Sequence, residues 1–135
     1  MEIINEFIIR RVRFHGKGSN DLEWFCYSLG LVGPRDKEKT SMKVFSMLLD
    51  AASRGTGLTT DDIAGKLGIS RGAVIHHLNR MVELGLIVQR GGKYMLRVNN
   101  LEELVDEIER DIQSTIKTIK KISENLDKKI KLEIK

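Results

Sequence analysis

The residues best suited to chemistry lie together on a predicted helix that runs from Ser70 to about Leu84. Val74, Leu78 and Met81 recur on one side of it, which indicates a buried apolar face. At roughly 100° per residue, the opposite side presents small and polar side chains. These are Gly72, His76, Asn79 and Glu83, with Ala73, Ile75 and Arg80 at the borders. Their chemistry is hydrogen bonding and ion pairing, because no nucleophile with a neighbouring base is recognisable in the sequence.

The start of this helix favours anions. Ser70, Arg71 and Gly72 open it, where free N–H groups and the helix dipole attract phosphate and a glycine allows close approach. In a major groove, Asn79 can pair with adenine and Arg80 with guanine or phosphate. The residues that we single out are Arg71, His76, Asn79 and Arg80. The alternative is that these are solvated residues of a structural helix.

A shorter helix must position this one. Thr59 or Thr60 can cap it, and Asp61 and Asp62 fall in its first turn, where the helix dipole favours acids. Its apolar face consists of Ile63, Ala64 and Leu67. Gly68 tolerates a positive φ between the two helices. Two helices joined by so short a turn must cross steeply.

A hairpin is predicted after these helices. Leu86–Arg90 and Lys93–Arg97 are typical of strands, and Gly91-Gly92 fits a two-residue turn between them. The side chains expected in the hairpin core are Leu86, Val88, Tyr94 and Leu96. Arg90 and Lys93 make the tip basic. Residues 56–97 hold six basic and three acidic side chains and so carry +3 of the chain's net charge of +4.

This order of helix, turn, helix and hairpin resembles the winged helix–turn–helix regulators, in particular the ArsR/MarR-like group of an archaeal type. Core, caps, turn and hairpin all fall in register over about 40 residues, which makes the likeness more specific than an isolated helix–turn–helix match. The residues that carry it are Leu58-Thr59-Thr60, Ile63-Ala64, Leu67-Gly68-Ile69-Ser70, Val74, His77-Leu78, Met81, Gly85-Leu86-Ile87 and Gly91-Gly92.

The resemblance implies binding to double-stranded DNA and control of transcription, usually by a dimer. In winged folds the hairpin tip reaches the DNA backbone or minor groove, so Arg90 and Lys93 are expected to contribute salt-sensitive affinity. The alternative for the tip is charge that serves solubility alone. A second hypothesis for the whole protein is a protein-interaction module within a transcription assembly, since a fold does not fix its use. We do not predict an enzyme.

The predicted fold class is mainly α with a small β-hairpin wing, followed by a long C-terminal dimerisation helix. We expect an N-terminal arm or strand over residues 1–18, the DNA-binding domain over 19–98 and the dimerisation helix over 99–135. Ser19 or Asn20 can cap a first helix that ends near Gly30. The apolar residues of a second helix, before Arg54, are Val44, Phe45, Leu48, Leu49 and Ala52.

The C-terminal helix is predicted to mediate dimerisation. Asn99 or Asn100 can cap it, and a helix over residues 100–130 would extend roughly 45 Å, too long for one winged head to cover. The residues expected at the dimer interface are Leu101, Val105, Ile108, Ile112, Ile119, Ile122 and Leu126. Residues 101–111 carry six acids and one base, and residues 117–135 carry seven bases and three acids. Leu104, Ile116 and Ile130 lie beside these residues and widen the apolar face, which favours packing against more than one helix over a simple two-stranded coil. The orientation of the helices stays open.

The composition of the chain also bears on its location and on possible redox and metal sites. The longest apolar run, residues 24–27, is too short to cross a membrane, and the first residues lack the pattern of a secretory signal, so we expect a cytoplasmic protein. Cys26 is expected to be a small buried hydrophobe, with a redox-sensing thiol as the alternative. His76 and His77 point about 100° apart on a helix and do not favour a shared metal. No cofactor or metal is predicted, and the sequence leaves any small-molecule effector unknown.

Overall fold

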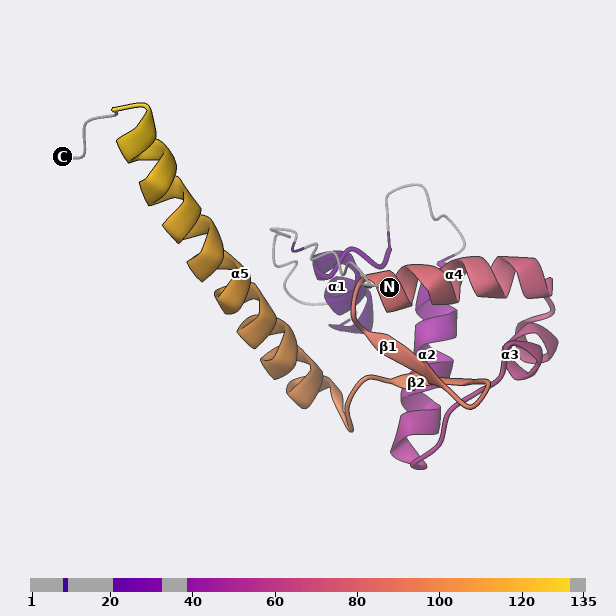
Figure 1. Ribbon diagram of the computed structural model, residues 1–135. Helices are drawn as coiled ribbons and strands as arrows, with labels where there is room; N and C mark the ends of the chain where they lie inside the picture. Colours follow the sequence, from indigo (N-terminus) through magenta and orange to yellow (C-terminus); the bar gives the residue numbers. More distant parts are fainter. Residues whose placement is uncertain (1–8, 10–20, 33–38, 132–135) are drawn as a thin grey trace. The chain divides into compact units, whose positions relative to one another are not determined.

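The computed structural model describes Ile9, residues 21–32 and residues 39–131 (Figure 1). They divide into two compact units with a boundary between Leu104 and Val105. The elements are α1 (Asp21–Ser28), α2 (Thr40–Ser53), α3 (Thr60–Leu67), α4 (Arg71–Glu83), β1 (Ile87–Arg90), β2 (Lys93–Leu96) and α5 (Leu101–Lys129). The predicted class, mainly helical with one antiparallel hairpin and a long last helix, is confirmed. The expected N-terminal arm over residues 1–18 and the Ser19 or Asn20 cap lie outside the described residues, apart from Ile9.

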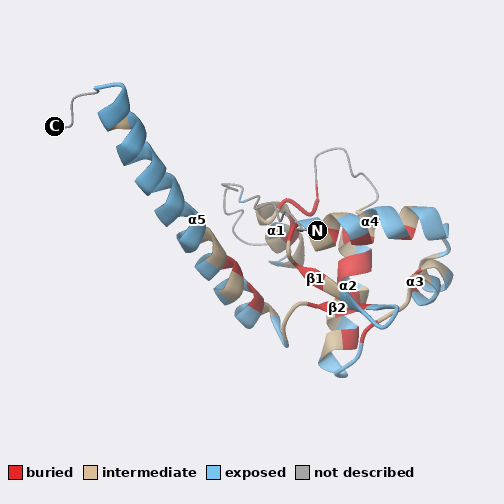
Figure 2. Cartoon of the chain, viewed as in Figure 1, coloured by how far each residue is buried: buried red, intermediate tan, exposed pale blue. Residues whose placement is uncertain are grey.

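The core of the first unit is centred on α2. Val44, Phe45 and Leu48 have no exposed surface, and the same holds for Val74, Leu78 and Met81 of α4. Buried positions, red in Figure 2, occur along α2, α4 and the hairpin. The helical spacing of each set puts it on one face, so that burying both faces together removes the apolar surface of two helices at once.

Local hydrogen bonds begin α3 and α4 where the sequence predicts. Thr59, rather than Thr60, caps α3: its side chain accepts from the Asp62 N–H, and the Asp62 carboxylate accepts from the Thr59 N–H. Those bonds hold the pKa of Asp62 below its usual value. Gly68 has φ 66°, and the Ser70 hydroxyl accepts from the Ala73 N–H to begin α4. The short turn between the two helices is therefore built from a left-handed glycine and a cap.

The hairpin pairs in the register that the Gly91-Gly92 turn dictates. Arg90 lies opposite Lys93, and Ile87 lies opposite Leu96. Our assignment of Val88 to the hairpin core is wrong: Ile87 is 1% exposed, whereas Val88 is half-buried and shares the other face with Met95. Leu86 is buried as expected, but it precedes the strand, so the period-two pattern that joined it to Val88 does not apply there.

A third segment adds to this hairpin. Leu58 exchanges both backbone hydrogen bonds with Tyr94, at 2.9 and 2.7 Å. The residue before it, Gly57, is buried, and a Cβ there would lie 2.6 Å from the Tyr94 carbonyl oxygen. The segment that links α2 to α3 is thereby held against β2, and only a glycine permits the approach.

We expect Gly57→Ala to destabilise the first unit by about 1–3 kcal/mol, because the added methyl must displace backbone. Gly65→Ala is the matched control: Gly65 is an exposed residue of α3 with nothing within 4 Å of an added Cβ, so this variant should gain roughly 0.5–1 kcal/mol. Urea unfolding followed by circular dichroism measures both. Equal midpoints for the two variants would contradict the close contact.

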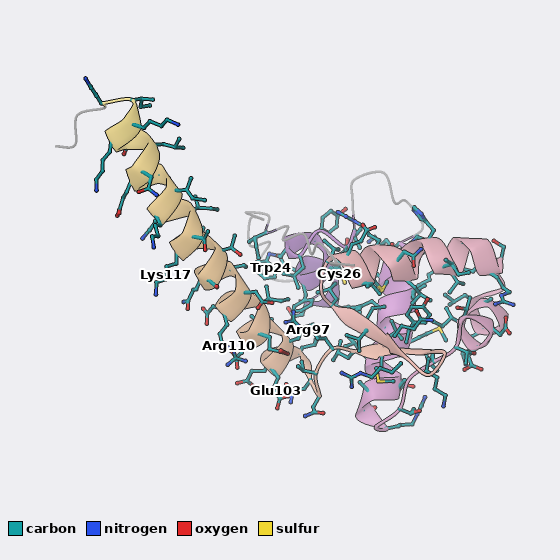
Figure 3. All side chains as sticks on the ribbon, viewed as in Figure 1. Trp24, Cys26, Arg97, Glu103, Arg110 and Lys117 are labelled. Carbon is teal, nitrogen blue, oxygen red and sulfur yellow. The ribbon has the colours of Figure 1, made fainter. Side chains whose placement is uncertain are left out.

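Cys26 of α1 is buried with no exposed surface, as the sequence predicts (Figure 3). Burial, with a smaller contribution from Glu23, raises the pKa of its thiol to about 12. The reactive form of a cysteine is the thiolate, so the folded protein holds this group in its unreactive form at neutral pH. The geometry favours a packing role over redox sensing.

Cys26 should therefore resist thiol reagents in the folded protein. At pH 8 an aromatic disulfide is expected to react about 1,000-fold more slowly than in concentrated urea, since a rise of three pKa units lowers the thiolate fraction by that factor. Stopped-flow absorbance under both conditions measures the ratio. Similar rates would show that the thiol is accessible.

Candidate nucleic-acid interface

α4 carries two faces of opposite character. Its apolar side is fully buried, whereas Ile75 on the other side is 37% exposed. The remaining predicted contact residues of the helix are also open to solvent, with Arg80 half-buried and the others exposed: Ser70, Arg71, Gly72, His76 and Asn79. The structure thus leaves the predicted residues of α4 accessible, with Gly72, His76 and Asn79 on the side opposite the buried face.

A partly buried hydrogen bond joins α4 to α2. Ser41 Oγ of α2 lies 2.8 Å from His77 Nδ1, and Ser41 is only 8% exposed. His77 is thus a partly buried imidazole with a hydrogen-bond partner. His76 is exposed and meets His77 edge to face, with ring centroids 5.6 Å apart. One histidine anchors the helix and its neighbour faces solvent.

Two of the predicted arginines make exposed ion pairs. Arg71 Nε lies 3.2 Å from Asp61 Oδ1, which ties the first turn of α4 to the first turn of α3. Arg80 Nη1 lies 3.4 Å from Glu83 Oε2. Both members of the Arg71 pair are about two-thirds exposed, at 67% and 71%, and such surface pairs contribute at most about 1 kcal/mol. The Arg71 guanidinium can therefore exchange its carboxylate for a phosphate at little cost.

The hairpin tip presents two cations side by side. Arg90 and Lys93 are directly paired across the strands, and both are exposed. Gly91 and Gly92 between them have φ 57° and 78°, the left-handed pair that a tight type I′ turn requires. The turn therefore projects both charges from the end of the hairpin.

A groove of about 600 Å³ lies between α4 and the hairpin. Its polar lining includes Asn79 from α4, Gln89 and Arg90 from β1, and Arg97 just after β2. Arg97 Nη1 donates to the Gly85 carbonyl oxygen at 3.4 Å (Figure 3). Gln89 is not among the predicted residues, because the expected core of Leu86 and Val88 places Gln89 on the solvent face of the hairpin.

The described residues give less support to a metal site or to a membrane-spanning helix. Across residues 21–32 and 39–131, no three His, Cys, Asp or Glu side chains gather in a way that could hold a metal ion. None of the described helices is long and apolar enough to cross a bilayer.

Comparison with known families agrees with this geometry. Residues 47–88 match the family model described as winged helix–turn–helix DNA-binding. The matched span runs from the second half of α2 through α3 and α4 into β1, and the structure supplies the rest of the wing. No curated protein and no solved structure gives a significant match to the chain.

The fold of the first unit is that of a winged helix–turn–helix, and the family model that matches residues 47–88 is described as DNA-binding. A domain of this class points to a regulator rather than an enzyme. The match favours double-stranded DNA over the alternative of a protein-interaction module. Both α3 and α4, with the turn between them, lie wholly within the matched residues.

Proposed function

We propose that this protein is a sequence-specific, DNA-binding transcriptional regulator that acts as a homodimer. α4 enters the major groove, and the hairpin tip contacts the neighbouring backbone or minor groove. The observation that carries the proposal is the open polar face of α4, whose opposite face is fully buried. The ArsR/MarR-like and archaeal character and a cytoplasmic location belong to the same proposal.

Several of the exposed residues of α4 and of the hairpin tip have roles that suit their chemistry. Asn79 lines the groove between α4 and the hairpin, and its side-chain amide can form two hydrogen bonds with an adenine. Ile75 is partly exposed and can contact a thymine methyl. Arg71 sits at the start of α4, where its guanidinium and the free N–H groups favour phosphate. Arg90 and Lys93 supply affinity that does not depend on sequence.

Replacing the arginines of α4 tests DNA binding. We expect Arg71→Ala with Arg80→Ala to weaken binding to a selected genomic fragment by roughly 10- to 100-fold. The salt slope should fall by about 1 for each phosphate that an arginine no longer neutralises. Arg54→Ala is the matched control, since Arg54 also pairs with a carboxylate, Asp50, but lies at the end of α2. Fluorescence anisotropy over a salt series measures all three proteins.

Two results would contradict the function. One is no binding of the parent protein to any genomic fragment even near about 50 mM salt, where phosphate contacts are strong. The other is binding by the double variant that equals that of Arg54→Ala.

The dimer part of the proposal rests on α5. Ile116, Ile119, Ile122 and Leu126 are each between 45% and 52% exposed, an apolar row that a single chain leaves in water. Of the predicted interface residues, Leu101 and Ile112 are half-buried and Val105 is exposed. Ile108 is only 5% exposed within the chain and has little surface left to offer. The support for self-association therefore lies in the later part of the helix.

Placing a charge in this row should separate the subunits. Ile119→Lys is expected to raise the dimer dissociation constant by about 100-fold or more, because both copies lose a buried isoleucine and gain a charge. Ser114→Lys adds the same charge to an exposed position outside the apolar row and should leave the dimer intact. Sedimentation equilibrium measures the constants. A monomeric parent protein would refute the homodimer.

A further inference from the structure

The spacing of the apolar row of α5 is the same when it is counted from either end. Ile112, Ile116, Ile119, Ile122 and Leu126 follow one another by steps of four, three, three and four residues. Steps of three and four keep the five side chains on one face of a helix, and four of them are exposed while Ile112 is half-buried (Figure 2). The row is therefore symmetric about Ile119.

We infer that the second subunit packs on this row in the antiparallel direction, with the two-fold axis at Ile119. The inference rests on the proposed homodimer and adds its orientation. Ile112 of one copy then lies opposite Leu126 of the other, Ile116 lies opposite Ile122, and the two Ile119 side chains meet at the centre. Every large apolar side chain of the row thereby faces another, as knobs and holes require.

The distribution of charge along α5 favours the antiparallel arrangement over the parallel one. Residues 102–111 carry six acids and one base, and residues 117–131 carry six bases and two acids. A parallel pair places the acidic segment beside its own copy. An antiparallel pair about Ile119 places residues 107–111, with three acids and one base, beside residues 127–131, with three bases and one acid, while residues 117–121 lie beside their own copy. Asp111 and Lys129 are 18 residues apart, or five turns, so they lie on the same flank of the row. The antiparallel axis brings Asp111 of one copy near Lys129 of the other.

The outer face of α5 stays in water in this arrangement. Glu103, Arg110 and Lys117 succeed one another at intervals of seven residues and project from one side of the helix (Figure 3). Helical geometry puts this charged line half a turn away from Ile119. The helix thus offers one apolar face to a partner and one charged face to solvent.

The orientation sets the span between the two copies. At 1.5 Å per residue, the two Val105 residues lie about 42 Å apart along an antiparallel pair, and about 8–10 Å apart in a parallel one. An antiparallel pair therefore places the starts of the two helices at opposite ends, and a parallel pair places them at the same end.

A double variant with Ile112→Cys and Leu126→Cys tests the orientation. Within one helix these positions lie about 21 Å apart, so a disulfide that joins 112 to 126 can form only between chains. After mild oxidation of the full-length protein, digestion at the lysines between them and mass spectrometry identify the linked peptides. We expect 112–126 links to predominate and Cys26 to stay unlinked, because it is buried.

Lys117→Cys, on the charged face, is the control and should give no linked chains. Links of 112 to 112 and 126 to 126 would overturn the inference in favour of a parallel pair. A dimer by mass that forms none of these links would overturn it by placing the contact elsewhere. A monomer by mass would refute the proposed homodimer itself, so the two failures are distinct. Circular dichroism confirms that each variant keeps its helix.

Discussion

Burial of Val74, Leu78 and Met81 without any exposed surface holds α4 in one rotational setting, and the site depends on that setting. A helix that turned by a quarter would exchange polar for apolar side chains at the surface and leave unpaired groups in the core. The Ser41–His77 hydrogen bond adds a directional contact to this non-directional burial. Rigidity on one side is therefore what makes a defined polar surface available on the other.

The ion pairs on this surface are weak, and a phosphate can take the place of their carboxylates. Arg71 and Arg80 have carboxylate neighbours in the free protein, and both pairs are at least partly exposed. Water already screens such pairs, so replacing a carboxylate with a phosphate changes little in stability while it adds an attraction to DNA. At the hairpin tip, Arg90 and Lys93 are separated by two glycines, so the turn itself supplies no carboxylate to pair with them. The net charge of the chain is only +4, but one region can still present a basic surface, because the carboxylates near its arginines are weakly held.

The two units answer different physical demands. The first unit buries most of its large apolar side chains in one core, with α2 at the centre. In α5 the apolar residues beyond Ile112 stay about half exposed, although they follow helical spacing as faithfully as those of α4. Periodicity shows that a face exists, but the burial of that face depends on what lies against it.

Local features of this chain follow from sequence alone where neighbouring residues supply the contact. The caps by Thr59 and Ser70 and the left-handed Gly68 depend on groups within three residues or on a missing Cβ, so each was predictable. Contacts across the chain decided the rest. Ser41 meets His77 from 36 positions away, and Leu58 pairs with Tyr94 from as far. Ile87 rather than Val88 faces the core, and Gln89 lines the groove, because long-range packing, which alternation cannot encode, selects the face of a strand.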